Sequence, residues 1–140
     1  MLLARGDGTA VAIAHAGWRG LAAGVLEAAI ASLGGRDADV LAWLGPAIGP
    51  THFEVGDEVR TAFCDREPRA AAAFARNGRG RWQCDLYLLA RQRLQAAGVT
   101  AVHGQIRCTY SEADNFFSYR RDGVTGRIAA LIWMEQTVST

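Results

Sequence analysis

The chain has 140 residues, of which half are apolar and 21% are charged. These values suit one packed domain and argue against intrinsic disorder. The formal net charge is only +1, so no basic field is predicted to recruit nucleic acid or a membrane surface. The longest apolar runs are shorter than the roughly 20 residues that a membrane helix needs. All 15 basic residues are arginine, which excludes a Schiff-base or P-loop lysine from any mechanism.

The chain has three cysteines, and an odd number does not suit a disulfide framework. They are Cys64, Cys84 and Cys108. No pair of them has the spacing of a zinc knuckle. We find no export signal, which would show a charged segment followed by an apolar stretch and a cleavage site. We therefore expect reduced thiols in a cytoplasmic protein.

The first half of the chain alternates strand and helix patterns. Asp7-Gly8 separates two apolar runs and predicts a hairpin near the N-terminus. A tight turn after His15 leads into an amphipathic stretch that Gly34-Gly35 ends. The predicted elements are a strand over 9–15, a helix over 21–33, a strand over 40–44 and a short strand over 52–55.

The second half continues the mixture. Asp85 is a good N-cap for the clearest helix, which Gly98 ends. The other predictions are a helix over 57–63, a short helix from Pro68 to about Asn77, a loop over 77–81, a strand within 99–108, an extended stretch over 116–121 and a final strand over 127–134. Together the patterns predict an α/β (α+β) fold with a mixed β-sheet and flanking helices.

His15 is the first candidate for chemistry. It stands at the carboxyl end of a predicted strand, followed by a glycine turn and a helix, where α/β folds place ligands. Such a histidine serves as a metal ligand or a general base. Arg19, near the start of the helix, is placed to bind an anion such as phosphate. The structural alternative is a strand-end histidine bonded to backbone, with Trp18 in the core.

The aromatic and basic segment 116–122 is the second candidate. In an extended segment, Arg120 and Arg121 would point to opposite faces, so that one enters a pocket. The phenylalanines and Tyr119 offer stacking surfaces for a planar base or sugar. The structural alternative is an aromatic core strand with a solvated arginine paired to Asp122.

The remaining candidates are weaker. Cys108 favours an inert packing role, because Arg107 is the only neighbour in sequence that would lower its thiol pKa. His52 and His103 have no partner at metal-ligand spacing. His15 alone does not supply the three protein ligands of a catalytic zinc.

Several motifs occur together and in a fixed order. They are His15-Ala-Gly-Trp-Arg-Gly20, Leu44-Gly-Pro-Ala-Ile-Gly-Pro50 with Phe53-Glu-Val55, Asp85-Leu-Tyr87 with Ala90-Arg91, and Cys108-Thr109 with Phe116-Phe-Ser-Tyr-Arg-Arg-Asp122 and Thr125-Gly-Arg127. In these motifs the chain resembles the YfiH-like, or laccase-domain, family over nearly its whole length. The family is also called the multicopper polyphenol oxidase family, domain of unknown function 152 and peptidoglycan editing factor.

The resemblance implies a YfiH-like mixed fold and an enzymatic activity. Family members are described as purine nucleoside phosphorylases acting on adenosine, inosine, guanosine and methylthioadenosine, with adenosine deaminase activity. Purine nucleoside and phosphate are therefore the expected partners. The family's metal is zinc, or copper in older descriptions, held by two histidines and a cysteine. His15 inherits one ligand position.

The resemblance also implies that the other two ligands lie upstream of Met1, the cysteine in an Asp-Cys-x-Pro segment. None of Cys64, Cys84 or Cys108 matches that cysteine. The chain is then expected to be the C-terminal portion of a longer domain, with an incomplete metal site and no activity alone. An exposed sheet edge would favour pairing with a second copy as a homodimer.

For the complete protein, phosphorolysis of a purine nucleoside is the favoured reaction, with Arg19 and either Arg120 or Arg121 as phosphate anchors. One alternative is a cysteine hydrolase, a peptidoglycan-precursor editing amidase with the upstream cysteine as nucleophile and His15 as base. A copper polyphenol oxidase needs more ligands than this sequence offers. An inactive remnant or binding module is the alternative without enzymatic activity.

Overall fold

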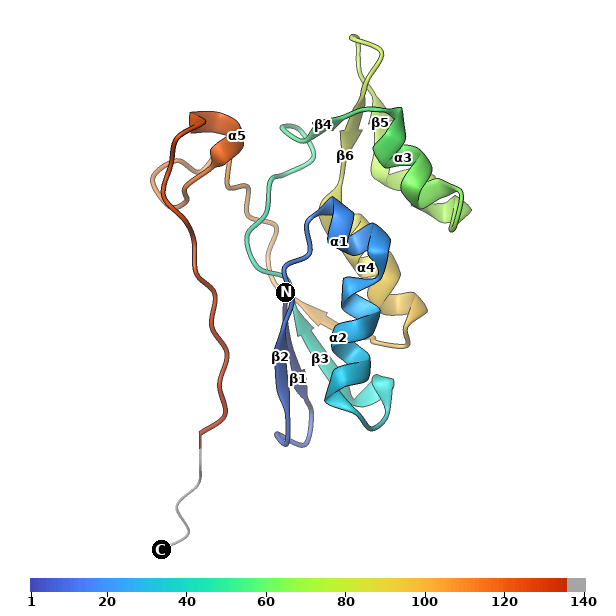
Figure 1. Cartoon of the computed structure of the whole chain (residues 1–140), viewed down its shortest axis with the longest axis vertical. Coiled ribbons are helices and arrows are strands. Elements are labelled where there is room, and N and C mark those ends of the chain that lie inside the picture. The colour runs from blue at the N-terminus through green and yellow to red at the C-terminus, as the bar shows by residue number, and fades with distance from the viewer. Residues whose placement is uncertain (136–140) are drawn as a thin grey trace, which may run out of the picture.

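The structure is a computed structural model that describes residues 1–135, and within them seven strands form two separate sheets (Figure 1). The strands are β1 (Leu2–Arg5), β2 (Val11–Ile13), β3 (Val40–Trp43), β4 (Glu54–Val55), β5 (Phe74–Arg76), β6 (Trp82–Cys84) and β7 (Ala101–His103). The α-helices are α1 (Trp18–Ala23), α2 (Val25–Leu33), α3 (Asp57–Cys64), α4 (Leu86–Ala96) and α5 (Tyr119–Asp122), and two 3₁₀ helices are η1 (Asp37–Asp39) and η2 (Pro68–Ala73). The predicted mixed α/β class is confirmed.

The larger sheet has the strand order β2-β1-β3-β7. β1 pairs antiparallel with both β2 and β3, whereas β3 and β7 run parallel. The predicted N-terminal hairpin is confirmed, but its second strand is shorter than the apolar run 9–15. His15 therefore lies beyond the end of β2, where the chain turns toward α1.

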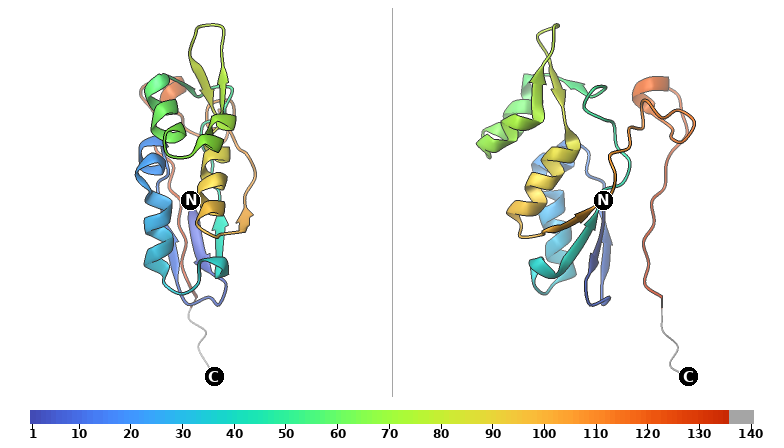
Figure 2. Two further views of the ribbon diagram at one scale, coloured as in Figure 1. Left: turned by 90° about the vertical axis from the view of Figure 1, so that its right-hand side faces the viewer. Right: turned by 180° about the vertical axis from the view of Figure 1, so that it is seen from behind.

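One face of this sheet is covered by α1, α2 and α4, and the other face is open (Figures 1 and 2). The period-2 pattern of β3 explains the difference: Val40 and Ala42 are buried, while Leu41 and Trp43 are exposed. The core between sheet and helices consists of apolar side chains, among them Leu3, Leu21, Leu26, Ile30, Leu89, Leu94 and Val99. Two of these helices, α1 and α4, also line the candidate site together with the residues that follow β2 and β3.

The smaller sheet has the order β4-β6-β5 and is antiparallel throughout. The predicted helix from Pro68 is a 3₁₀ helix that stops at Ala73, earlier than expected, because the chain then enters β5. The predicted loop over 77–81 is the turn of the β5–β6 hairpin. α3 packs against η2 beside this sheet.

The predicted single helix over 21–33 is in fact two helices. Gly24 separates α1 from α2, with a φ of 90° in the left-handed region. That conformation ends one helix and starts the next at little cost only for a residue without Cβ. The apolar stripe continues across the break, because Leu21, Leu26, Ile30 and Leu33 are all buried. Periodicity alone therefore did not reveal the interruption.

Two predictions in the last third of the chain are wrong. Residues 119–122 form the helix α5 instead of an extended stretch, because Ser118 caps the Arg121 N–H. Residues 127–134 form no strand, and Leu131 and Trp133 are exposed. No strand within residues 1–135 pairs with this segment, which runs apart from both sheets (Figures 1 and 2). Apolar residues alone do not make a strand without a hydrogen-bonding neighbour.

Within residues 1–135, no helix is both long and apolar enough to cross a membrane.

Candidate functional site

A cavity of about 350 Å³ lies between the carboxyl ends of β2 and β3, the start of β1, and the helices α1 and α4. Its volume is within the range of small-molecule sites. Most of the lining is apolar, and the side chains with hydrogen-bonding groups are His15, Trp18 and Tyr87. The lining residues are Met1, Ala14, His15, Ala16, Gly17, Trp18, Leu44, Gly45, Pro46, Ala47, Ile48, Phe53, Leu86, Tyr87 and Ala90.

His15 stands on the cavity wall in the turn between β2 and α1, and it is exposed. The turn is tight, because a Cβ at Gly20 would lie 3.2 Å from the His15 carbonyl oxygen. Glycine at position 20 therefore lets the first turn of α1 approach the backbone that carries His15. The prediction that a glycine-rich turn presents this histidine at a ligand-binding edge agrees with its place on the cavity wall.

Arg19 and Arg120 lie beside aromatic residues of the cavity wall. The Arg19 Cζ is 4.4 Å from the ring centroid of Trp18, and the Arg120 Cζ is 5.6 Å from that of Phe53. Neither guanidinium has a hydrogen-bond or ion-pair partner among the described residues. Both are exposed. Neither lines the cavity itself, and Arg19 lines a separate surface pocket with Thr61 and Asp65. Each guanidinium lies next to the cavity only through one aromatic residue of its lining.

Arg121 is placed differently from its neighbour. Its Nη1 donates to the carbonyl oxygens of Thr109 and Tyr110, both at 2.9 Å, and its Nη2 donates to Phe116 at 3.0 Å. Nε and Nη2 also donate to the carboxylate of Asp122 at 2.8 Å. These hydrogen bonds hold the pKa of Asp122 below its usual value. Every donor of Arg121 is therefore used to fold residues 109–122.

Tyr87 is a site residue whose role the sequence motif did not reveal. Its buried hydroxyl accepts hydrogen bonds from the backbone N–H of Ala47 at 3.0 Å and of Arg107 at 3.2 Å. It lies 2.8 Å from the Arg107 carbonyl oxygen, to which it donates. One helix side chain thus joins the loop after β3, which lines the cavity, to the segment after β7.

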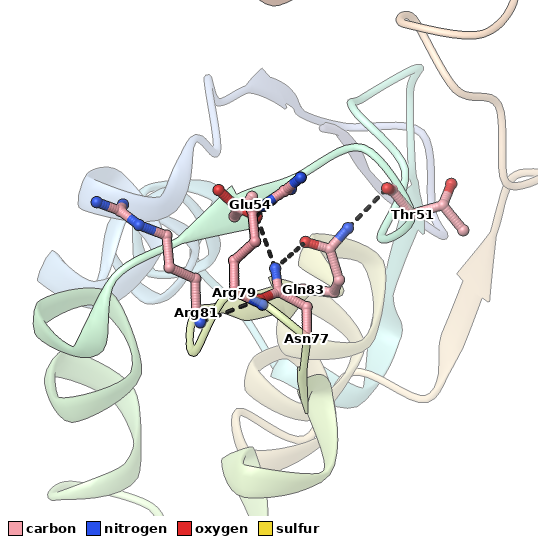
Figure 3. A network of polar contacts seen from close by, with 6 residues as sticks. All are labelled: Thr51, Glu54, Asn77, Arg79, Arg81 and Gln83. Atoms are coloured by element: carbon pink, nitrogen blue, oxygen red, sulfur yellow. Dashed lines mark hydrogen bonds and ion pairs between the residues drawn. The ribbon is translucent and has the colours of Figure 1, made fainter.

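A polar network fixes the loop that carries Phe53 (Figure 3). The Asn77 side chain donates to Glu54 at 2.6 Å, and its oxygen accepts from the backbone N–H groups of Arg79 and Arg81 at 3.0 Å. Gln83 donates to the Thr51 carbonyl oxygen at 2.6 Å. The Arg79 guanidinium pairs with Glu54. The network ties the tip of the β5–β6 hairpin to β4.

The described residues do not by themselves fit a metal ion. Residues 1–135 contain no group of three or more histidine, cysteine or acidic side chains arranged to hold one. His15 is the one predicted ligand that reaches the cavity. All three cysteines are free thiols, as predicted, and Cys84 is buried on the core side. No chemical step is therefore assigned to a metal in this chain.

The comparisons identify the fold and its relatives. The sequence profile of a family described as multi-copper polyphenol oxidoreductase laccase matches residues 1–135. The chain belongs to this family. Among solved structures, NMB0706 of Neisseria meningitidis aligns with a TM-score of 0.94 and 52% identity, over 96% of this chain and 56% of that one. YlmD of Geobacillus stearothermophilus aligns with a TM-score of 0.75 and 33% identity, over 81% and 44%.

Curated relatives of this laccase-like family are named purine nucleoside phosphorylases. The protein PA4543 of Pseudomonas aeruginosa is 57% identical over 92% of this chain and 54% of its own length. YfiH of Escherichia coli is 55% identical over 91% of this chain and 52% of its own length. The chain thus spans about half the length of the curated relatives that it matches.

Proposed function

We propose that the cavity beside His15 belongs to a purine nucleoside phosphorylase site. The observation that carries this proposal is an apolar cavity whose lining residues Trp18 and Phe53 each have an exposed guanidinium beside them. These guanidinium groups, from Arg19 and Arg120, have no polar partner among the described residues. An apolar slot suits the flat face of a purine, and free guanidinium groups suit phosphate. The names of the relatives support the same reaction.

In the proposed reaction, phosphate attacks the anomeric carbon of the ribose. The bond from that carbon to the purine nitrogen breaks and a carbon–oxygen bond to phosphate forms. The proton that phosphate loses ends on the leaving purine. The transition state is oxocarbenium-like, so the site must orient phosphate and stabilise charge. Arg19 and Arg120 are our phosphate anchors. The hydrogen bonds of Arg121 favour a structural role for that residue.

The proposed substrates are adenosine, inosine, guanosine and methylthioadenosine. His15 stays our predicted zinc ligand, and adenosine deaminase activity is a further prediction for the site. Since the described residues supply no metal cluster, the test below addresses nucleoside and phosphate binding by this chain.

The first test uses Gly45, which lines the cavity and where a Cβ would meet no atom within 4 Å. We expect Gly45→Leu to fill cavity space and to weaken inosine binding at least tenfold in calorimetric titrations. Gly78→Leu, in the β5–β6 turn and equally free of contacts, is the matched control and should bind as the original chain does. Absence of inosine binding, or equal binding by both variants, would contradict the proposal.

The second part of the test separates the reactions and the arginines. For the complete protein, which is expected to carry the rest of the site upstream, release of hypoxanthine that rises with phosphate concentration supports phosphorolysis, whereas release without phosphate supports hydrolysis. Oxygen uptake with a phenol would favour the oxidase alternative, and amide cleavage would favour the hydrolase alternative.

We expect Arg19→Ala and Arg120→Ala each to weaken phosphate binding by about tenfold. An unchanged phosphate affinity removes that arginine from its proposed role.

A further inference from the structure

Cys108 and His52 lie next to each other although 56 positions separate them in sequence. The Cys108 Sγ is 3.6 Å from the His52 Nδ1. Cys108 follows β7 and is joined to the loop after β3 by a parallel bridge with Ala47. His52 comes from the end of that same loop, just before β4. Neither residue lines the cavity beside His15, so the two form a separate cluster.

Both partners are held in place. The His52 ring stacks on Tyr110 with centroids 4.4 Å apart, and its Nδ1 is 3.0 Å from the Thr51 hydroxyl. The Gly49 N–H donates to the Cys108 sulfur at 3.2 Å. The Cys108 N–H donates to Glu112 at 2.8 Å. Cys108 and His52 are half-buried, so neither residue is enclosed in the core.

The surroundings favour a thiolate at this position. Burial acts to raise the pKa of Cys108, but hydrogen bonds from Ser111 and from the Gly49 and Tyr110 backbone outweigh it and lower that pKa to about 6. Cys84 shows the opposite case, since burial next to Asp85 raises its pKa to about 12. Among thiols, the thiolate is the reactive form.

We propose that Cys108 and His52 form a thiolate–imidazole pair that exchanges with small disulfides, leaving a reversible mixed disulfide on Cys108. The Cys108 sulfur attacks one sulfur of the disulfide and a new S–S bond forms. The original S–S bond breaks, and its electron pair leaves on the second sulfur as a thiolate that takes a proton from water. Cys108 is oxidised and half of the small disulfide is reduced. The proposal does not depend on the phosphorylase reaction.

The test measures the rate of mixed-disulfide formation with glutathione disulfide from pH 5 to 9. Trypsin cleaves after arginine and places each cysteine on its own peptide, 61–66, 82–91 and 108–120, so mass spectrometry reads the three rates separately. The same chain unfolded in urea gives each cysteine's rate without the folded surroundings. This comparison needs no variant.

The thiolate fraction and the weaker intrinsic nucleophilicity of a low-pKa thiol together set the expected result. At pH 5.5 folded Cys108 should react about 10- to 20-fold faster than in the unfolded chain, and its rate should level off above about pH 7. Cys84 should be protected by folding. A folded Cys108 profile that matches the unfolded one, or faster reaction at Cys64, would overturn the proposal.

The role of His52 is tested by His52→Gln, with His103→Gln as the matched control on an exposed residue of β7. We expect His52→Gln to slow Cys108 at least threefold at pH 5.5 and to move the midpoint of its pH profile upward. His103→Gln should leave the profile unchanged. If His52→Gln also leaves it unchanged, the proposed pair is wrong.

Discussion

At the scale of single residues, the Tyr87 hydroxyl is the hydrogen-bonding centre of the candidate site. It satisfies the backbone N–H groups of Ala47 and Arg107, which come from two segments far apart in sequence. Buried donors that lose their partner retain the full cost of their desolvation. This side chain therefore decides how the two segments meet at the cavity.

We predict that Tyr87→Phe lowers the free energy of unfolding by about 2 kcal/mol. The Arg107 N–H loses its acceptor, and the Ala47 N–H keeps only the 3.3 Å contact to the Arg107 carbonyl oxygen. Urea unfolding measures the change. Tyr119→Phe is the control, since Tyr119 is exposed and its hydroxyl makes no hydrogen bond among the described residues. Equal stability of the two variants would show that the Tyr87 hydroxyl is replaceable, for example by water.

At the scale of elements, the β5–β6 hairpin is fastened to β4 through Glu54 (Figure 3). The hydrogen bond from Arg79, with that from Asn77, holds the pKa of Glu54 below its usual value of 4.5. A carboxyl with a lower pKa in the folded state stabilises folding when ionised. The stabilisation is complete above the unfolded pKa and is lost as the pH falls through the folded pKa.

We predict that Glu54→Gln lowers the thermal midpoint at pH 7 and that the difference from the original chain shrinks below about pH 4.5. The glutamine keeps the side-chain shape and removes the charge. Thermal unfolding of both chains between pH 3 and pH 7 measures the difference. A difference that is constant over this range would assign the effect to hydrogen bonding without charge.

At the scale of the whole molecule, the larger sheet is covered on one face only. Ile13, Leu41 and Trp43 are 52%, 43% and 54% exposed on or beside the open face. β2 and β7 are the edge strands of this sheet. Exposed apolar surface next to unpaired strand edges favours association with another chain. A homodimer formed by this sheet remains our prediction.

We predict that the chain sediments as a dimer and that Leu41→Lys with Trp43→Lys shifts it to a monomer. The lysines place like charges on a surface that would otherwise be buried between copies. The control is Leu131→Lys with Trp133→Lys, at two exposed positions on the extended segment away from the sheet. This control should sediment as the original chain does. Sedimentation velocity decides the outcome. A monomer at all concentrations in the original chain would contradict the prediction.

Elements with local signals can be predicted from the amino-acid sequence. Asp85 and Gly98 delimited α4, Asp7-Gly8 placed the first hairpin, and the glycine turn after His15 pointed to the edge where the cavity lies. Caps, turns and short motifs depend on neighbouring residues, so they can be predicted from the chain alone. The ordered motifs also predicted the family.

Which residues distant in sequence meet depends on how the chain folds. In the folded chain Arg121 donates to backbone carbonyl oxygens within residues 109–122. Arg120 instead lies beside Phe53, with no polar partner among the described residues. The sequence of two adjacent arginines does not reveal this difference. The fold also places His52 next to Cys108. Segment 127–134 is not a strand, although its composition favours one, because a strand exists only where a neighbour accepts its hydrogen bonds. Contacts between segments distant in sequence depend on how the whole chain packs, and local patterns do not encode them.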